Sequence, residues 1–229
     1  MTLAALFIAT AAAHGAHDAD HLLPQTYWMA ALDADWSDAD DGTLFTWEGE
    51  AWLGDRDKLW LKTEGESLDG DVADAEAQFL YRAMISEFWD VYGGLRYDFE
   101  PESRGHAVAG LTGTLPYFVE TDAALFLSDD GVRSARVEHA LELHVTQDLI
   151  LEPHVEFNLS GRDRKEEGVG AGLTDIEAGL KLAYRITPEI APYLDLVWER
   201  AVGETAILAR AAGEDVEETT LRIGLSVRF

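Results

Sequence analysis

The last nine residues, LRIGLSVRF (Leu221–Phe229), decide the fold class. Apolar side chains occupy every second position of this stretch, and arginine, glycine or serine stands at each position between them. A period of two is that of a β-strand with one apolar and one polar face, whereas an amphipathic helix has a period near 3.6. The chain is therefore expected to end in a strand that faces two different environments.

The same alternation recurs along the chain from residue 26 onward. Residues 137–145 and 176–184 repeat it clearly, with charged side chains on the polar face. Each such run is about ten residues long, which is enough for a tilted strand to cross a bilayer. We identify twelve segments, beginning near residues 26, 43, 57, 74, 88, 105, 117, 132, 149, 174, 190 and 217. Twelve is an even number, as in single-chain bacterial outer-membrane barrels.

The connections between these segments alternate in character. Those after the odd-numbered segments are rich in Asp, Gly and Ser, and we expect several to be long: Ser37–Gly42, Pro101–Gly105, Gly161–Gly172 and Ala201–Glu217. The others are tight: Gly54–Asp57, Leu115–Pro116, Thr146–Asp148 and Thr187–Glu189. This sorting is typical of a barrel with external loops and periplasmic turns, and a soluble sandwich has no reason to show it. We predict an all-β fold, a closed up-and-down antiparallel transmembrane β-barrel of about 12 strands over residues 26–229.

Outward aromatic residues near the strand ends point to a membrane, because amphipathic rings prefer the level of the lipid headgroups. They are Trp36, Trp47, Tyr97 and Trp198 near the loops, and Trp89, Tyr184 and Phe229 near the turns. An alternating run that stops on an aromatic residue also resembles the C-terminal assembly signal of bacterial outer-membrane proteins. We therefore expect the chain to lie among the lipids of a Gram-negative outer membrane.

Two prolines, Pro153 and Pro192, fall inside predicted strands. Proline has no N–H to donate, and a closed barrel offers no edge that would excuse the missing hydrogen bond. We expect a bulge or a frayed pair near the turn-side end of each strand.

The N-terminus carries an apolar run, LAALFIATAAA, at residues 3–13. It is too short for a membrane-spanning helix, which needs about 20 residues. It has the length of the apolar region of a signal peptide, followed by small residues suited to cleavage, although the usual basic residues before it are missing. We predict a signal peptide at residues 1–13, with a buried N-terminal helix as the alternative, and a short His/Asp-rich segment at residues 14–25.

Composition excludes several classes of function. With 17 Lys and Arg against 44 Asp and Glu, the net charge is −27, so no basic surface is available for nucleic acid. Hydrophobic residues make up 47% of the chain, too many for a disordered acidic tail. The absence of cysteine excludes disulfides, thiolate metal sites and cysteine nucleophiles.

The inward face of the predicted barrel is strongly acidic. Among the alternate positions that would point into the lumen, carboxylates outnumber Lys and Arg by about two to one. Such a lumen attracts cations and repels anions. The alternative is that these charges only pair with one another and fill a narrow barrel.

Inward positions also hold candidate metal ligands near the turn side. His154 lies between Glu152 and Glu156, and His144 lies on the neighbouring strand across a tight turn, so we expect the two imidazoles to approach each other. Imidazole with carboxylate suits Cu(II), Zn(II) or Ni(II), and thioether suits Cu(I). The further candidates are Met29 and Met84 near the same end, and His106 beside an external loop. For each residue the alternative is a role in packing or hydrogen bonding.

A second candidate site is local in sequence. His14, His17 and His21 fall within HGAHDADH, and three imidazoles in eight residues can wrap one divalent ion without a preformed fold. The alternative is a polar linker between signal peptide and barrel.

Catalytic motifs are missing from the sequence. It contains no Gly-x-Ser-x-Gly turn, no His-Glu-x-x-His and no phosphate-binding glycine loop. We therefore expect a protein that is not an enzyme, and an outer-membrane hydrolase with a Ser–His pair is a minor alternative.

Six stretches resemble the copper resistance protein B family of Gram-negative outer membranes. They are LWLKTEGE (59–66), FWDVYGGLRYDFEP (88–101), LILEPHVEFNLSGRD (149–163), GLTDIEAGLKLAYRI (172–186), APYLDLVWER (191–200) and ARAAGEDV (209–216). The resemblance implies an outer-membrane β-barrel that binds copper ions and acts beside a periplasmic multicopper oxidase in copper tolerance. Family members usually carry an N-terminal extension rich in Met and His, of which this chain has only the short HGAHDADH.

Together these observations lead us to expect an outer-membrane copper-binding protein in copper resistance. It would concentrate or pass copper ions through an acidic lumen, where weak binding at several sites suits passage better than one tight site. The alternative is a structural or narrow cation-selective barrel that binds metal incidentally.

Overall fold

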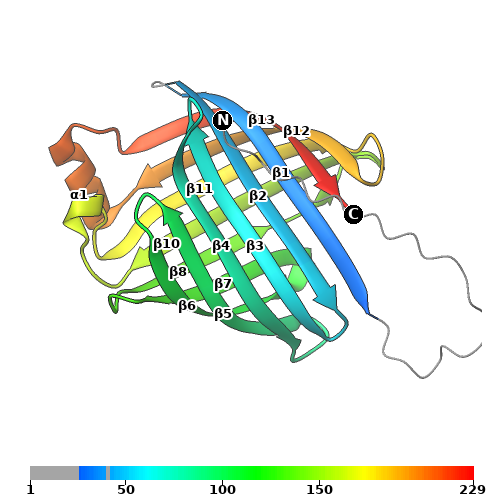
Figure 1. Ribbon diagram of the computed structural model, residues 1–229. Coiled ribbons are helices and arrows are strands. Elements are labelled where there is room, and N and C mark those ends of the chain that lie inside the picture. The colour runs from blue at the N-terminus through cyan, green and yellow to red at the C-terminus, as the bar shows by residue number, and fades with distance from the viewer. Residues whose placement is uncertain (1–25, 40–41) are drawn as a thin grey trace, which may run out of the picture.

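The computed structural model describes residues 26–39 and 42–229, which fold into a closed β-barrel (Figure 1). Its strands are β1 (Tyr27–Ala39), β2 (Gly42–Gly54), β3 (Asp57–Leu68), β4 (Asp71–Met84), β5 (Trp89–Glu100), β6 (Arg104–Leu115), β7 (Val119–Ser128), β8 (Arg133–Ala140), β9 (Leu143–His144), β10 (Leu149–Ser160), β11 (Gly172–Tyr184), β12 (Ile190–Ala201) and β13 (Glu217–Arg228). β8 and β9 form one barrel strand because both pair with β10, so the barrel has twelve strands. These begin within three residues of the predicted positions, which confirms the predicted fold.

The barrel closes because its last strand pairs with its first. β13 runs antiparallel to β1, with Ala31 opposite Arg228 and Trp36 opposite Ile223. The other neighbours follow chain order around the ring, as an up-and-down barrel requires. We call the end that holds Tyr27 and Phe229 the turn end, and the opposite end the loop end.

Apolar side chains cover the outside of the barrel, as the alternation predicts. In β13, Leu221, Ile223 and Leu225 are exposed on the outer surface, whereas the alternate residues Gly224 and Ser226 are buried inside. This arrangement would be unstable in water, where such a continuous apolar surface marks a membrane or an interface. It is the arrangement expected of a barrel in lipid.

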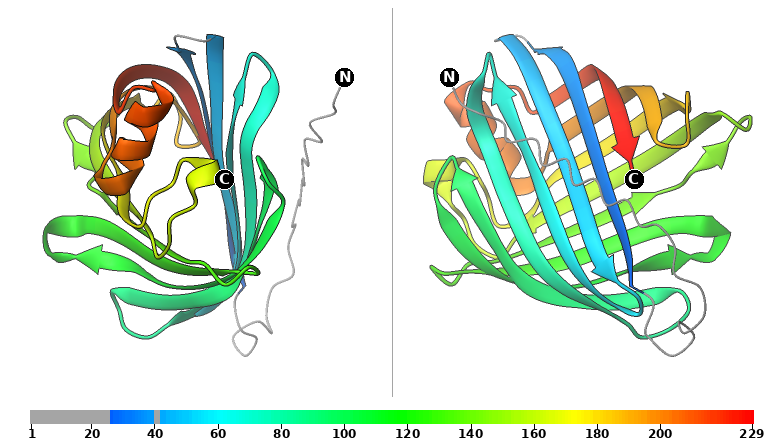
Figure 2. Two further views of the ribbon diagram at one scale, coloured as in Figure 1. Left: turned by 90° about the vertical axis from the view of Figure 1, so that its left-hand side faces the viewer. Right: turned by 45° about the vertical axis from the view of Figure 1, so that its right-hand side comes forward.

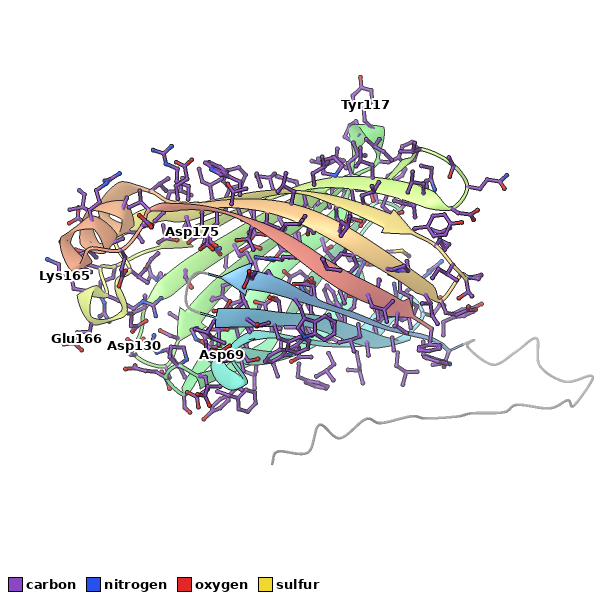
Figure 3. The ribbon with its side chains drawn as sticks, turned by 90° about the horizontal axis from the view of Figure 1, so that it is seen from above. Asp69, Tyr117, Asp130, Lys165, Glu166 and Asp175 are labelled. Carbon is purple, nitrogen blue, oxygen red and sulfur yellow. The ribbon has the colours of Figure 1, made fainter. Side chains whose placement is uncertain are left out.

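Aromatic side chains gather outside at both ends. At the loop end the rings of Trp36 and Phe45 lie 5.1 Å apart, and Phe45 stacks on Trp47 at 6.0 Å. At the turn end Tyr117 projects away from the barrel, as Figure 3 shows, and Phe118 beside it is also exposed. These two bands lie at the levels expected for lipid headgroups.

Both strand prolines are accommodated as predicted. Pro153 in β10 lies opposite the break between β8 and β9, where its carbonyl accepts a hydrogen bond from Leu141 N. Pro192 in β12 lies beyond the last pair with β11, at Tyr193. Neither strand therefore needs the N–H that proline lacks.

Two of the connections expected to be long are short. Pro101–Gly105 is one of them, because β5 ends at Glu100 and β6 begins at Arg104. Ser37–Gly42 is the other, because β1 runs to Ala39 and β2 begins at Gly42. Likewise β3 and β4 are joined by Asp69 and Gly70 alone, both with positive φ, which is the geometry of a tight Asp-Gly hairpin turn. Residues rich in Asp, Gly and Ser can close a tight turn as readily as they can form a loop.

The long connections follow β10 and β12. The first contains the short 3-10 helix η3 (Lys165–Glu167), and the second contains α1 (Gly203–Ala212), while η2 (Pro116–Phe118) lies in a turn. The two long connections contact each other, since Gly170 N donates a hydrogen bond to Thr205 Oγ1 at 3.0 Å. Figure 2 shows both at the loop end, which faces the viewer in its left-hand view. Over residues 26–39 and 42–229, no helix is long and apolar enough to cross a membrane.

One side of the lumen is filled by packed side chains. Six buried residues from β3 to β7 form this interior cluster: Trp60, Leu80, Tyr92, Val108, Ala124 and Phe126. Trp60 and Tyr92 meet edge to face at 5.5 Å, and the Tyr92 hydroxyl donates to Asp122. The main cavity inside the barrel lies along the other side.

Candidate functional site

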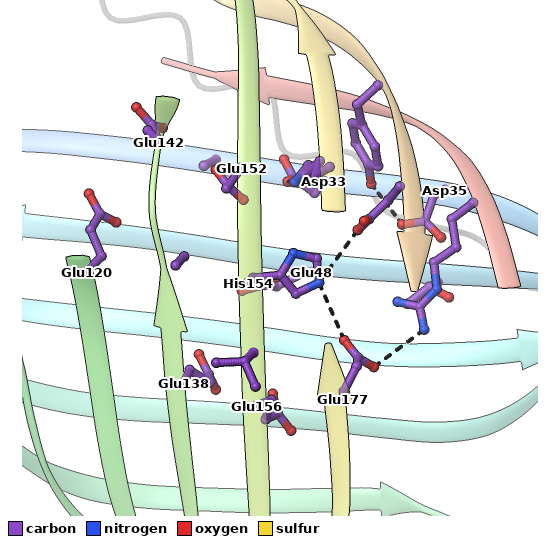
Figure 4. Close-up of a pocket in the computed structure, with 18 of the residues that line it drawn as sticks. Asp33, Asp35, Glu48, Glu120, Glu138, Glu142, Glu152, His154, Glu156 and Glu177 are labelled. Carbon is purple, nitrogen blue, oxygen red and sulfur yellow. Dashed lines mark hydrogen bonds and ion pairs between the residues drawn. The ribbon is translucent and has the colours of Figure 1, made fainter. Parts of the chain in front are cut away.

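A cavity of about 380 Å³ lies inside the barrel, mainly along β1, β2, β8 and β10 to β13. We call it the acidic vestibule, because eleven carboxylates line it against three Lys and Arg side chains (Figure 4). The carboxylates are Asp33, Asp35, Glu48, Glu50, Glu120, Glu138, Glu142, Glu152, Glu156, Glu177 and Asp195. The cations are Lys181, Arg222 and Arg228. This lining is more acidic than the inward face as a whole was expected to be.

The vestibule reaches the turn end of the barrel. Two of its lining residues, Glu142 and Arg228, have side chains that are 36% and 58% exposed, and they form an ion pair of 3.9 Å at the mouth. A second cavity, of about 70 Å³, lies beside this mouth. It is lined by the same two residues and by residues of the connection between β11 and β12. In outer-membrane barrels the short turns face the periplasm.

Strand register places five carboxylates side by side on the inner wall. Each is directly opposite the next across β7, β8, β10, β11 and β12. We call this set the carboxylate row: Asp122, Glu138, Glu156, Glu177 and Glu199. Like charges directly opposite each other on neighbouring strands repel. The row is therefore a place where a bound cation relieves an unfavourable interaction.

His154 projects into the vestibule next to this row. Its Nε2 lies 3.7 Å from Glu177 Oε1 and 3.9 Å from Asp195 Oδ2, and the other oxygen of Glu177 lies 3.7 Å from Arg222 (Figure 4). Two donor atoms that each lie roughly 2.0–2.2 Å from the same tetrahedral metal ion are about 3.3–3.6 Å apart, so these separations are only slightly longer than those of ligands that share an ion. Within the part of the chain that the structure describes, no three His, Asp or Glu side chains are arranged as a preformed metal site.

A second polar group lines the wall from β11 to β1, with side chains from β11, β12 and β1. The Tyr193 hydroxyl donates to Asp35 Oδ2 at 2.8 Å, and Lys181 Nζ contacts Asp33 Oδ2 at 2.5 Å while lying 4.3 Å from the Tyr193 ring. The remaining oxygens Asp35 Oδ1 and Asp195 Oδ1 are buried and accept no hydrogen bond from the described residues. These carboxylates keep unused acceptor capacity inside the vestibule.

The structure keeps the predicted group around His154 but does not bring His144 to it. Glu152, His154 and Glu156 all line the vestibule. His144 pairs with Ile150 of β10, whereas His154 of β10 pairs with Ala140. The two histidines are therefore four residues apart along the strand direction, which is about 13 Å at the usual rise per residue. The expected approach of the two imidazoles is therefore not formed. His144 lies exposed at the turn end, 4.0 Å from Glu142.

The other predicted ligands are scattered. Met29 is half-buried opposite Trp52, and Met84 is exposed at the end of β4. His106 lies toward the loop end, outside the vestibule, with Nε2 bonded to Asp98 Oδ2 at 2.9 Å and its ring against Phe126. The N-terminal histidines His14, His17 and His21, like the predicted signal peptide, lie outside the described residues.

Sequence reasoning missed the partners of His154. Glu177 and Asp195 were expected to face inward, but not to lie beside His154, because alternation fixes the face of a residue and not its neighbours around the barrel. Counting outward from the tight turn between β11 and β12 would have paired those two strands, but β10 and β11 are joined by a long connection, from which their register cannot be counted.

Comparison with known proteins agrees with the resemblance seen in the sequence. Residues 26–229 match the family described as "Copper resistance protein B precursor (CopB)". The chain is 38% identical over 218 residues to "Copper resistance protein B homolog" of Pseudomonas syringae pv. tomato, covering 94% of this chain and 74% of that protein. It is 35% identical over 205 residues to "Copper resistance protein B" of Escherichia coli, covering 88% of this chain and 69% of that protein.

Solved structures share the fold at low sequence identity. The NanC porin superimposes with a TM-score of 0.59 and 15% identity, over 86% of this chain and 98% of the porin. The KdgM porin gives a TM-score of 0.55 and 10% identity, over 87% and 99% of the two chains. These likenesses support an outer-membrane barrel fold alone. The family match and the two curated relatives go further: this chain is an outer-membrane β-barrel that belongs to the copper resistance protein B family and has a role in copper resistance.

Proposed function

We propose that this barrel concentrates copper ions in its acidic vestibule at the periplasmic end. Copper is the cargo, and the chain handles it without catalysing a reaction. The observation that supports this most directly is the carboxylate row, in which five carboxylates stand directly opposite one another on the inner wall. Because such neighbours repel, and Arg136 and Arg222 contact only Glu156 and Glu177 of the row, a further cation is the natural counterpart of this wall.

Charge alone would attract any cation, so preference for copper needs a softer ligand. His154 supplies an imidazole between Glu177 and Asp195, and imidazole with carboxylate suits Cu(II). Only small side-chain movements are needed for these groups to share one ion, because donor atoms bound to the same tetrahedral ion lie about 3.3–3.6 Å apart and His154 Nε2 already lies 3.7 and 3.9 Å from the two carboxylate oxygens. The unused oxygen of Asp195 is available for such a movement.

The shape of the vestibule suits loading and release. Several separate carboxylates give weak binding at many points, which lets an ion enter and leave. We expect the turn end to exchange copper with the periplasm, where a multicopper oxidase is the partner expected from the resemblance, and the outer apolar surface to contact outer-membrane lipid.

Copper titration of the detergent-folded chain tests this proposal. Cu(II) and then Cu(I) are added to the unmodified chain, to His154→Ala and to a matched control, His106→Ala, which removes an inward imidazole outside the vestibule. We expect saturable binding that is weakened at least tenfold by His154→Ala and unchanged by His106→Ala. Equal binding by all three chains would reject His154 as a ligand. It would favour the second candidate, a structural or narrow cation-selective barrel in which metal binding is incidental.

A further inference from the structure

One ion pair crosses the lumen from wall to wall. The Arg136 guanidinium on β8 contacts the Glu64 carboxylate on β3. In a ring of twelve strands, β3 and β8 are five strands apart, which is nearly opposite. By comparison, Arg82 and Asp90 form an ion pair of 2.6 Å between the neighbouring strands β4 and β5 and so stay against the wall.

Arg136 is held in this crossing position from its own side. Its Nε lies 3.5 Å from Glu156 Oε1 and 3.4 Å from Asn158 Oδ1. Asn158 in turn donates to Glu156 at 2.6 Å and to Asp175 at 2.8 Å. The side chain is only 18% exposed, so it is packed on all sides although it lies inside the lumen. Charge-assisted contacts of this kind fix an arginine more firmly than a single neutral hydrogen bond.

Along β8, β10 and β11 the lining of the acidic vestibule stops at this level. Glu138, Glu156 and Glu177 lie side by side across β8, β10 and β11, and all three line the vestibule. The next row toward the loop end contains Arg136, Asn158 and Asp175, and none of these lines it.

The remaining cross-section is already occupied. On the side of β3 to β7, the interior cluster around Trp60 and Tyr92 fills the lumen. Phe126 of that cluster lies under the Arg96 guanidinium at 5.1 Å. Arg136 and Glu64 therefore span the part of the lumen that the aromatic side chains leave open.

We propose that Arg136 is the residue that separates the acidic vestibule from the loop-end half of the lumen and so determines whether small cations pass through the barrel. This rests on the proposed function in that the cations collected below Arg136 include copper. The guanidinium blocks passage in two ways: its volume fills the gap, and its positive charge repels a cation that has reached the carboxylate row. Releasing Arg136 from Glu64 would join the two halves into one path.

Conductance of the full chain in planar lipid bilayers tests the proposal. The unmodified chain is compared in potassium chloride with Arg136→Gln and with Glu64→Gln, which leaves the arginine but frees it from the opposite wall. Arg82→Gln is the matched control, because it removes an inward arginine whose ion pair does not cross the lumen. Folding of each variant is checked by its heat-dependent migration in gels, so that Glu64→Gln still decides the question if Arg136→Gln does not fold.

We expect the unmodified chain and Arg82→Gln to conduct weakly, and Arg136→Gln and Glu64→Gln to conduct several-fold better with a preference for potassium over chloride. Conductance of the folded variants equal to that of the unmodified chain would overturn the proposal. So would a high conductance of the unmodified chain.

Copper titration of Arg136→Gln separates this proposal from the proposed function. If copper binds the vestibule, Arg136→Gln still binds it, because the ligands lie below the arginine. If no copper binds but Arg136→Gln conducts, the division of the lumen stands and the copper proposal falls. If copper binds but the conductance of Arg136→Gln equals that of the unmodified chain, the copper proposal stands and the division of the lumen by Arg136 falls.

Discussion

The imidazole of His154 lies directly over Gly179 of the neighbouring strand. The two residues are paired across β10 and β11, and a Cβ built on Gly179 would come within 2.2 Å of the His154 ring. The same relationship joins Tyr193 to Gly224 and Tyr92 to Gly110, again between paired residues. An inward ring thus lies flat against the wall where the next strand has no side chain, which leaves room in the lumen and fixes the ring.

Gly179→Ala should therefore act on copper binding without changing any charge. The new methyl group displaces the His154 ring from its position beside Glu177 and Asp195, so we expect weaker Cu(II) binding, approaching that of His154→Ala. Gly105→Ala is the control, since a Cβ there meets nothing within 4 Å. Isothermal titration of both variants measures the effect. Binding by Gly179→Ala equal to that of the control would show that the ring position does not matter.

The carboxylate row predicts effects of opposite sign on stability and on binding. Glu138 lies between Asp122 and Glu156, so Glu138→Gln removes two repulsive contacts. We expect the free energy of unfolding of the metal-free barrel to rise by about 0.2–1 kcal/mol, and copper affinity to fall. Urea unfolding in lipid vesicles and copper titration measure the two quantities.

The control for this prediction is Glu166→Gln, at an exposed residue of η3 that lies far from the vestibule, at the end that also holds α1 (Figure 3). Glu166→Gln should change neither the free energy of unfolding nor the copper affinity. A decrease in stability on Glu138→Gln would mean that attraction to Lys or Arg outweighs repulsion within the row.

Tyr193→Phe should destabilise the barrel through Asp35. The hydroxyl donates a hydrogen bond to Asp35 Oδ2 at 2.8 Å, and the other carboxylate oxygen already lacks a partner among the described residues. Removing the donor leaves a buried acceptor unsatisfied, which costs about 1–3 kcal/mol. Urea unfolding measures the loss, and Tyr184→Phe, at an exposed outward tyrosine, should cost little. Equal effects of the two substitutions would contradict the role of this hydrogen bond.

The turn between β7 and β8 carries a prediction about pH. The Ser128 hydroxyl donates to Asp130, with help from Val132 N–H at 3.3 Å and Arg162 at 3.1 Å, and together these hold the pKa of the Asp130 carboxyl below its ordinary value of 3.8. A lowered pKa stabilises the turn above the unfolded-state pKa, and this contribution is lost as the pH falls through the folded-state pKa.

Ser128→Ala should move the titration of Asp130 upward toward its ordinary value. Carboxyl NMR of the chain labelled at aspartate measures it. Ser103→Ala, which removes a hydroxyl bonded to the Phe99 carbonyl in another loop, should leave the titration of Asp130 where it was. An unchanged titration in Ser128→Ala would assign the lowered pKa to Arg162 and the backbone instead.

Much of the fold follows from the sequence because a barrel strand has to alternate. A one-residue slip would turn every side chain of Leu221–Phe229 to the wrong face, so the pattern fixes strand positions and faces strongly. The missing N–H of proline is likewise readable from the sequence, and Pro153 and Pro192 lie where pairing on one side of the strand is interrupted or has ended. Loop length was less predictable, since Asp69 and Gly70 close a turn with residues that also suit long loops.

The site was only partly predictable because its contacts cross strands that are far apart in sequence. His154, Glu152 and Glu156 share a strand, and alternation alone places them in the lumen. The expected approach of His144 failed because the tight turn at residues 146–148 places His144 opposite Ile150, four residues along β10 from His154, and this register is the same on both sides of the break after Ala140. The contact between Arg136 and Glu64 depends on closure of the whole ring, which local pattern does not encode.

The most direct test of the central claim is the electron paramagnetic resonance spectrum of Cu(II) bound to the full chain with His14, His17 and His21 replaced by alanine. If copper enters the vestibule, the spectrum should show one nitrogen donor among oxygen donors, and the nitrogen coupling should disappear when His154→Ala is added. A nitrogen signal that survives His154→Ala, or the spectrum of free hydrated Cu(II) before that substitution is made, would contradict copper binding in the vestibule.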